Sequence, residues 1–379
     1  MPQKKVNLSG PTLKLFYITL KIKHSKEMKK LLTILFSVAA CAAANAADYS
    51  LMYVFGDSYS DVGNNSVSQS SSRSPYAYGG RWSNGKLWNE YLAENLGMNA
   101  PTISKEYMHG DSPEEGQNNF AYAGARSEKN NLSEIPTVYE EIHGLPEYEI
   151  YLYVGFNRYG VNFSENDLVL VWGGINDVVF WDDVIFEGYE SSDYGKESAL
   201  NMASRVQELI TMGAKNLVVL NLPNLAHLPI ASEGVEWRPV WFDEGTQAFN
   251  ETFANEINAL VETYKDEGVQ ITQVDVCALL DNIMADPLAY GFEDAENELV
   301  VALADNENLD QDKYLFFDEM HLTTAGHKLI ADAVYDAMTV PEPSTYAAIF
   351  GLFALAFAAC RRRKRFWADR HKNTSIHRI

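Results

Sequence analysis

Ser58 is the residue of this sequence best placed to act as a nucleophile. It lies in the segment Gly-Asp-Ser-Tyr-Ser-Asp-Val-Gly-Asn at 56–64, directly after an apolar run at 50–55. A serine on a turn after a buried strand presents its hydroxyl at the edge of a sheet, but free serine is a weak nucleophile and needs an adjacent base. A Gly-Asp-Ser tripeptide alone most often marks a turn. Its position after a strand and its Asp-x-Gly-Asn continuation make Ser58 a candidate nucleophile.

His321 is the candidate base for that serine. It ends the segment Phe-Asp-Glu-Met-His at 317–321, and imidazole is the side chain that most often serves as a base near neutral pH. Asp318 lies three residues earlier and can reach back to hold the ring in one tautomer, as the acid of a serine–histidine–aspartate triad does. His327 is a rival base, but it falls at or inside the last predicted helix, where we expect it to cap or pack.

Two further segments offer hydrogen-bond donors for a developing oxyanion. The segment 119–125 contributes the backbone N–H of Gly124, and the segment 174–177 contributes the side-chain amide of Asn176. With the N–H of Ser58 they make three donors. The loss of one such donor typically costs about 2.7–4 kcal/mol of transition-state stabilisation.

Other polar features near these segments have simpler explanations. We expect Asp57 to bond the backbone of its turn and Asn64 to cap or orient the loop. The acidic run at 305–312 lacks the central glycine and the final glutamate of a calcium-binding loop, so a solvated loop is expected there. The sequence therefore indicates no metal and no cofactor.

The elements that must position these residues indicate an α/β domain. Short apolar runs of strand length alternate with segments of helical periodicity, without a linker or an internal repeat. In such sheets, sites form at the carboxyl ends of the strands. Predicted strands are 50–55, 168–172, 216–220 and 269–274, and predicted helices are 87–96, 200–212, 249–264 and a last helix over 329–337.

Long polar or aromatic segments interrupt this scaffold and are expected to form loops or short helices that line a substrate cleft. The aromatic run at 180–183, with Phe186 and Tyr189, could form an apolar wall there or serve only as structural filler. The interrupting segments are 65–85, 101–118, 127–162 and 178–199.

The composition excludes several other classes of protein. The chain has 379 residues, 46% of them hydrophobic, and a formal net charge of -22. Its basic residues gather at the two ends, so the central domain is more acidic still and is expected to repel nucleic acid. Of the three cysteines, Cys277 alone lies between the ends, which excludes an internal disulfide in the central domain, and we expect it to be a small buried apolar residue.

The first 46 residues read as an upstream segment and a secretory signal peptide. Met28 begins a lysine-containing start, the apolar run 31–44 follows, and Ala-Asn-Ala at 44–46 provides a small-residue cleavage site. We expect cleavage between Ala46 and Ala47. A membrane anchor is the weaker alternative, because the run is short for a bilayer span.

The last 39 residues, 341–379, carry a second targeting signal. Val-Pro-Glu-Pro at 340–343 is followed by an apolar stretch at 346–360 and five basic residues at 361–365. These three parts, in this order, resemble the PEP-CTERM sorting signal of bacterial envelope proteins, although the chain continues past the basic cluster. The resemblance implies transient membrane anchoring and removal by an exosortase-type protease; a simple C-terminal anchor helix is the alternative. The predicted domains are therefore 1–46, 47–340 and 341–379.

The four chemical segments, in their order along 50–340, resemble the blocks of the GDSL/SGNH hydrolase family. The family's nucleophile and catalytic base match Ser58 and His321, and the aspartate of its last block matches Asp318. Its oxyanion-hole glycine and asparagine match Gly124 and Asn176. Further likeness lies in Gly-Arg-Trp-Ser-Asn-Gly at 80–85, Asn-Leu-Pro at 221–223 and Thr-Ala-Gly-His at 324–327. The sequence departs from the family pattern in Ala123, where a second glycine is common, and in Leu322, where many members have proline.

This resemblance implies a three-layer flavodoxin-like fold with a central parallel sheet, and hydrolysis of acyl esters through an acyl-enzyme without a metal. The sequence thus predicts an exported esterase or lipase at the cell surface or outside the cell. Its partners would be signal peptidase, the sorting protease and an acyl ester of a lipid or a polysaccharide. Alternatives are a polysaccharide O-acetyl esterase, an acyltransferase, or a non-catalytic surface or matrix protein that uses the fold.

Overall fold

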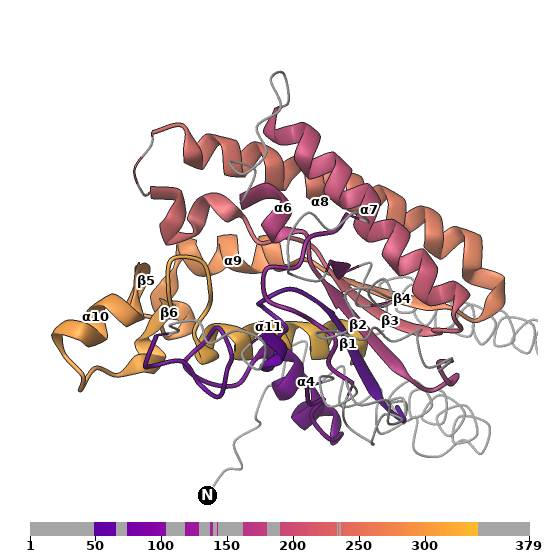
Figure 1. The fold of residues 1–379 in the computed structure, drawn as a ribbon, viewed down its shortest axis with the longest axis horizontal. Helices are drawn as coiled ribbons and strands as arrows, with labels where there is room; N and C mark the ends of the chain where they lie inside the picture. Colours follow the sequence, from indigo (N-terminus) through magenta and orange to yellow (C-terminus); the bar gives the residue numbers. More distant parts are fainter. Residues whose placement is uncertain are drawn as a thin grey trace, which may run out of the picture. The chain divides into compact units, whose positions relative to one another are not determined.

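The computed structural model describes residues 49–65, 74–103, 118–128, 137–138, 142, 162–179, 190–232, 234 and 236–339 (Figure 1). These residues belong to a compact unit that runs from Asp48 to Met338, apart from the last residue of the final helix. The predicted signal peptide with its cleavage site, the sorting tail and the aromatic run at 180–183 lie outside the described residues.

A parallel sheet of four strands is the centre of the described part of the chain. Its order is β1 (Met52–Gly56), β2 (Leu168–Trp172), β3 (Asn216–Leu220) and β4 (Gln270–Val274). The first two strands, Met-Tyr-Val-Phe-Gly and Leu-Val-Leu-Val-Trp, are buried along their whole length, as expected for parallel strands covered on both faces. The four predicted strands are confirmed, two of them with their predicted bounds.

A short segment at 118–122 extends the sheet beyond β1. Val54 donates its N–H to Asn118 at 3.0 Å, and Phe120 donates to Val54 at 2.8 Å, in parallel register. The order across the sheet is then 118–122, β1, β2, β3 and β4, which is the doubly wound order of a flavodoxin-like fold. This confirms the predicted fold class. This strand was not predicted, because the segment is short and overlaps the segment 119–125 that contains Gly124.

Helices cover the two faces of the sheet (Figure 1). The helices α6 (Ile175–Val179), α7 (Ser191–Thr211) and α8 (Arg238–Tyr264) lie on one side, and α4 (Trp88–Leu96) lies on the other. The last helix, α11 (Thr324–Thr339), lies beside α4, since Asn95 of α4 donates a hydrogen bond to Asp332 of α11 at 3.2 Å. The result is the predicted three-layer arrangement.

Two of these helices begin well before their predicted starts at 200 and 249. The start of α7 is largely polar, and Gly195 of α7 packs directly on Gly245 of α8. A Cβ on Gly195 would lie 2.2 Å from the carbonyl oxygen of Gly245. The two backbones therefore touch through glycines, a contact that leaves no periodic apolar signal in the sequence. The part of 178–199 from Ser191 onward belongs to the long helix α7, where loops or short helices were predicted.

The remaining elements lie around the sheet and were not predicted. Cys277 lies in one of the helices, α9 (Val276–Ala285), and is half-buried instead of fully buried. Burial raises the pKa of its thiol to about 11, and nearby aspartates add to the shift. These elements are η5 (Leu225–His227), η6 (Pro229–Ser232), η7 (Lys265–Glu267), α9 (Val276–Ala285), η8 (Pro287–Tyr290), β5 (Asp294–Glu298), α10 (Leu299–Asp305), η9 (Gln311–Lys313) and β6 (Tyr314–Phe316).

The strands β5 and β6 pair in parallel as a separate small sheet. The predicted solvated run at 305–312 lies between them along the chain, from the last residue of α10 through turns to the start of η9, and is largely exposed. Within the described ranges, no helix is long and apolar enough to cross a bilayer.

Candidate active site

Ser58 lies on the turn that ends β1, at the carboxyl edge of the sheet. Gly56 makes this turn possible, because its φ of 147° is unfavourable for other residues and a Cβ there would lie 1.9 Å from the carbonyl oxygen of Trp172. The same oxygen accepts a hydrogen bond from the N–H of Asp57 at 3.3 Å. The turn thus leaves β1 directly against β2. The Ser58 side chain is nearly buried, with 5% of its surface exposed.

Asp57 supports the turn and does not face solvent. Its Oδ1 accepts the N–H of Tyr59 at 3.1 Å, and its Oδ2 is buried without a hydrogen-bond partner among the described residues. Burial raises the pKa of Asp57 to about 7, against the opposing effects of the hydrogen bond from Tyr59 and the charge of His321. The carboxyl group is therefore protonated over most of the acidic range.

Asp61 and Asn64 connect the turn that carries Ser58 (the serine turn, 56–64) to the segment that contains Gly124 (the glycine block, 119–125). The amide of Asn64 donates to the carbonyl oxygens of Asn119 at 2.8 Å and Ala121 at 2.9 Å. The carboxylate of Asp61 accepts four backbone N–H groups, those of Gly63, Asn64, Asn65 and Ala123. Because Ala123 directly precedes Gly124, these bonds set where the glycine block lies relative to Ser58.

His321 lies on the loop between β6 and α11 and reaches the serine. Its Nε2 is 2.8 Å from Ser58 Oγ, and its Nδ1 is 2.7 Å from Asp318 Oδ1 and 2.9 Å from Oδ2. Asp318 Oδ1 also accepts the backbone N–H groups of Met320 at 3.0 Å and His321 at 2.7 Å. The structure thus brings the three predicted residues into one hydrogen-bonded row.

The electrostatics of Asp318 favour its ionised form. Burial alone would raise the pKa of this carboxyl group, but the charge of His321 and the hydrogen bonds from His321 and the loop backbone outweigh burial and bring the pKa below its ordinary value. Asp318 is therefore a carboxylate at neutral pH, held against the imidazole.

The predicted oxyanion donors lie on neighbouring segments at the same edge of the sheet. Gly124 has a φ of 88°, which suits glycine. Asn176 is the second residue of α6, shortly after the end of β2, and its Nδ2 donates to the carbonyl oxygen of Ala125 at 2.9 Å. The next residue, Asp177, accepts the N–H and the hydroxyl of Ser127. The asparagine and the glycine block are thus held together, each next to a strand end.

The rival histidine, His327, is buried inside α11. Its ring packs edge-on against Tyr59 with the centroids 6.1 Å apart, and neither ring nitrogen has a hydrogen-bond partner among the described residues. Burial lowers the pKa of His327 to about 3. It is a neutral packing residue and contacts neither Ser58 nor a carboxylate.

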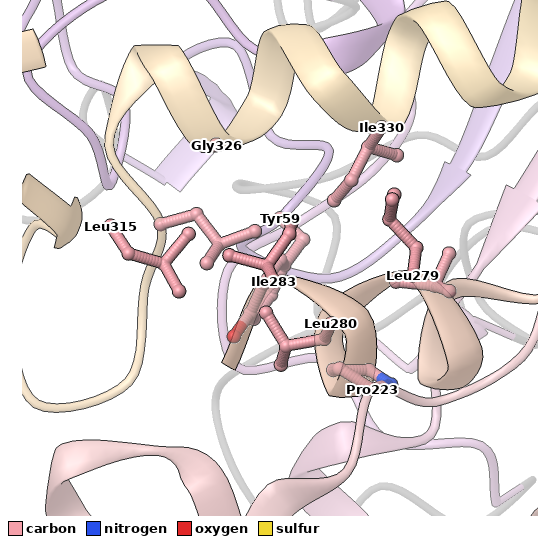
Figure 2. A pocket seen from close by; sticks show the side chains of 10 residues that line it. Tyr59, Pro223, Leu279, Leu280, Ile283, Leu315, Gly326 and Ile330 are labelled. Carbon is pink, nitrogen blue, oxygen red and sulfur yellow. The ribbon is translucent and has the colours of Figure 1, made fainter. Parts of the chain in front are cut away.

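A small apolar cavity lies beneath the serine turn, between Tyr59 and the helices α9 and α11 (Figure 2). Its volume of about 10 Å³ would hold roughly one water molecule, and its walls offer almost no polar partner. It is too small for an acyl chain. Across the described ranges, there is no group of three or more side chains that could hold a metal ion.

One aromatic contact at this site had no assigned role in the sequence. The indole of Trp82 stacks on the imidazole of His321, with ring centroids 5.0 Å apart and an angle of 29° between the planes. The motif at 80–85 that contains Trp82 was visible in the sequence, but its position far from His321 along the chain gave no sign of the contact.

A serine, a histidine and an aspartate hydrogen-bonded in a row are the constellation found in serine hydrolases. Here they stand at the carboxyl edge of a doubly wound sheet, and this fold and site define a hydrolase of mixed α/β class. The chain belongs to the GDSL-like lipase/acylhydrolase family, whose sequence profile matches residues 52–334. It is accordingly an enzyme that acts on ester bonds.

Relatives across most of the chain agree with this family. The chain is 26% identical over 364 residues to a phosphatidylcholine-sterol acyltransferase of Aeromonas hydrophila, which covers 92% of this chain and 94% of that protein. It is 22% identical over 319 residues to the GDSL esterase/lipase EXL6 of Arabidopsis thaliana, covering 78% and 93%. Among solved structures, the acetyl xylan esterase AlAXEase matches 76% of this chain and 99% of its own, at 13% identity and a TM-score of 0.33.

The C-terminal tail has its own match. The PEP-CTERM protein-sorting motif matches residues 339–364, which confirms the predicted sorting signal. Apart from Thr339, these residues lie outside the part of the chain that the structure describes.

Proposed function

We propose that the chain is an exported esterase in which Ser58 is the nucleophile, His321 the general base and Asp318 the residue that orients and stabilises the charged imidazole. The single observation that carries this proposal is the row of contacts from Ser58 Oγ to His321 Nε2, at 2.8 Å, and from Nδ1 to Asp318, at 2.7 Å. All three side chains are nearly buried, so their interactions are weakly screened by water.

The proposed reaction proceeds in two halves. His321 Nε2 takes the hydroxyl proton of Ser58 as Oγ attacks the ester carbonyl, and the resulting imidazolium is stabilised by ionised Asp318. The imidazolium then protonates the leaving alcohol, which departs and leaves an acyl-serine. In the second half, His321 activates a water that attacks the acyl-serine, and the protonated imidazole returns its proton to Ser58 as the acid is released.

The oxyanion of each tetrahedral intermediate would be held by the N–H groups of Ser58 and Gly124 and by the amide of Asn176. Two features support this role. Neither backbone N–H makes a hydrogen bond to another described residue, and the bond from Asn176 to Ala125 uses only one of the two amide protons. Asn176→Ala should lower kcat by about 100- to 1000-fold and change KM little.

The first test is hydrolysis of p-nitrophenyl esters of increasing chain length by the full chain and by Ser58→Ala. We expect the variant to lose nearly all activity, and the wild type alone to react with a phosphonate probe of active serines. Ser192→Ala, on the partly exposed start of α7, is the matched serine control and should retain full activity. Unchanged turnover in Ser58→Ala would refute the proposed nucleophile.

A second proposal concerns the acceptor of the acyl group. Because one relative is a phosphatidylcholine-sterol acyltransferase that matches 92% of this chain, the acyl-serine could also be released by an alcohol in place of water. Incubation with an acyl donor and a sterol or glycerol acceptor, followed by product analysis, distinguishes transfer from hydrolysis. Acetate release from an acetylated polysaccharide would instead indicate the O-acetyl esterase alternative.

We also propose that the chain is exported and then sorted through its tail. Signal peptidase would cut after Ala46, and an exosortase-type protease would act near the Pro-Glu-Pro at 341–343, within the matched sorting motif. Cell fractionation with mass measurement of the mature chain tests both cuts. Replacement of Glu342 by alanine should leave the tail attached if this motif directs the cleavage.

A further inference from the structure

The imidazole of His321 contacts two aromatic rings from different parts of the chain. Trp82 stacks on it at 5.0 Å and 29° between planes, and Tyr59 lies at 5.6 Å with a tilt of 44°. Tyr59 is the neighbour of Ser58 and is fully buried, so the serine turn explains its position. Trp82 comes from a separate loop, so its position beside His321 does not follow from the chain connectivity of Ser58 or His321.

The loop that carries Trp82 is bonded to the residues that follow His321. Ser83 Oγ donates to the carbonyl oxygen of Leu322 at 2.9 Å, and Asn84 Oδ1 accepts the N–H of Thr324 at 2.8 Å. Thr324 Oγ1 in turn donates to the carbonyl oxygen of Lys86 at 2.9 Å. Directly after His321 in the chain, the two loops are therefore joined by hydrogen bonds and not by packing alone.

The close fit of the two loops continues at Gly85. A Cβ there would lie 2.5 Å from Oγ1 and 2.6 Å from Cβ of Thr324, so no larger residue fits without a shift. The other end of the loop is fixed by Arg81, whose guanidinium makes two bonds of 2.7 Å to the carboxylate of Glu90 on α4. Such a bidentate pair fixes geometry as well as charge. Trp82 thus has a rigid support on both sides.

Stacking on an indole is an interaction that depends on the charge of the imidazole. A cation within about 6 Å of the face of a tryptophan is attracted by roughly 0.5–2 kcal/mol, whereas a neutral ring gains less. In the proposed reaction His321 is neutral in the resting site and positive in each transition state. A contact of this kind therefore stabilises the transition states more than the ground state, which is the requirement for catalysis.

We propose that Trp82 is a positioning residue for the ester hydrolysis, which holds the His321 ring toward Ser58 and stabilises its charged form by stacking. This inference rests on the proposed function of His321 as the base. It assigns a role to the segment 80–85, here named the clamp segment. This segment holds the histidine loop through the stacking of Trp82 and the hydrogen bonds of Ser83 and Asn84.

The pH dependence of the reaction is the readout that distinguishes this role from simple packing. The ionisable groups that face His321 are Asp318 on its own loop, Asp57 and Tyr59 on the serine turn, and His327 on α11. None of them lies on the clamp segment, so a substitution of Trp82 leaves all four in place.

The experiment compares Trp82→Leu and Trp82→Phe with the wild type, using the full chain and a p-nitrophenyl ester. Leucine keeps the contact dry and apolar but cannot stack on a cation, whereas phenylalanine can. We expect Trp82→Leu to lower kcat roughly three- to tenfold with little change in KM. The acidic limb of its kcat/KM profile should move to lower pH by about half a unit, because the charged ring loses support. Trp82→Phe should recover most of both effects.

Two controls separate the possible failures. Trp237→Leu removes a partly exposed tryptophan on the turn before α8 and should leave the pH profile unchanged. Thermal unfolding of each variant shows whether the fold survives. If Ser58→Ala abolishes activity but Trp82→Leu keeps the wild-type pH profile, or if Trp82→Phe is as impaired as Trp82→Leu, the role of Trp82 is refuted. If Ser58→Ala remains active, the proposed function fails instead.

Discussion

The turn that carries Ser58 and the loop that carries His321 each bury one carboxyl group beside the reacting atoms, and they support it differently. Asp57 receives one backbone N–H on Oδ1, while its Oδ2 has no hydrogen-bond partner among the described residues. Asp318 receives two backbone N–H groups and the Nδ1 of His321. Burial raises the pKa of Asp57 to about 7, whereas partners overcome burial and lower the pKa of Asp318.

The difference teaches that burial does not by itself decide the charge of a carboxyl group. Both groups lie in the same site, yet the number of hydrogen-bond donors and the direct hydrogen bond from His321 decide which one stays ionised. In the proposed reaction the loop needs a carboxylate to stabilise an imidazolium, whereas the turn needs only a hydrogen-bond acceptor. Three substitutions test this contrast.

The largest effect is expected for Asp318→Asn. The variant keeps the shape of the side chain but loses the negative charge against His321, so kcat should fall by roughly a thousandfold or more. Measurement of kcat for the same ester, beside Asp266→Asn at an exposed site in η7, provides the comparison. Retention of more than a tenth of the wild-type kcat would show that the charge is not required.

An intermediate effect is expected for Asp61→Ala on the serine turn. Four backbone N–H groups would lose their acceptor, and we expect the free energy of unfolding to fall by about 3 kcal/mol or more. Activity should fall as well, because the glycine block loses its tie to the turn. Urea unfolding checks this. Asp61→Asn retains one acceptor oxygen and should lose less; equal losses would contradict the hydrogen-bond explanation.

The smallest effect on turnover is expected for Asp57→Asn, since an amide resembles the protonated carboxyl group. The effect that identifies this variant is a change in how the free energy of unfolding depends on pH. The pKa of Asp57 is about 7 in the folded protein and 3.8 ordinarily, so the contribution of Asp57 to the stability of the wild type decreases as pH rises from about 4 to about 7 and then levels off. Asp57→Asn removes this decrease, and its stability relative to the wild type should rise over the same interval. Unfolding curves at pH 4, 5.5 and 7 would reveal a flat difference if Asp57 were ionised throughout.

The sheet was predictable because its central strands are buried on both faces and appear as uninterrupted apolar runs. Leu-Val-Leu-Val-Trp at 168–172 and Asn-Leu-Val-Val-Leu at 216–220 have this form, and their bounds were predicted correctly. The starts of α7 and α8 were not, because the contact there is made by the glycines Gly195 and Gly245. A pattern of apolar side chains cannot reveal a place where two backbones touch.

The candidate site also has a part that the sequence predicts and a part that it does not. Ser58 and His321 could be proposed from short motifs, because each motif places a reactive side chain next to a recognisable element. The bonds that assemble the site could not be predicted. The hydrogen bond from Ser83 Oγ to the carbonyl oxygen of Leu322 and the bond from the N–H of Ala123 to Asp61 join segments far apart in the chain. In each bond one partner is a backbone atom, which leaves no mark in the sequence.

The distance along the chain between the two proposed reacting residues has a consequence for the timing of activity. Ser58 and His321 are separated by 263 positions, so the serine is synthesised near the start of the domain and the histidine just before its last helix. A growing chain holds an unassisted, weakly nucleophilic serine until almost the whole domain has been made. On the proposed assignment, a growing chain has no esterase activity until residue 321 has been made and its loop has folded against the turn that carries Ser58.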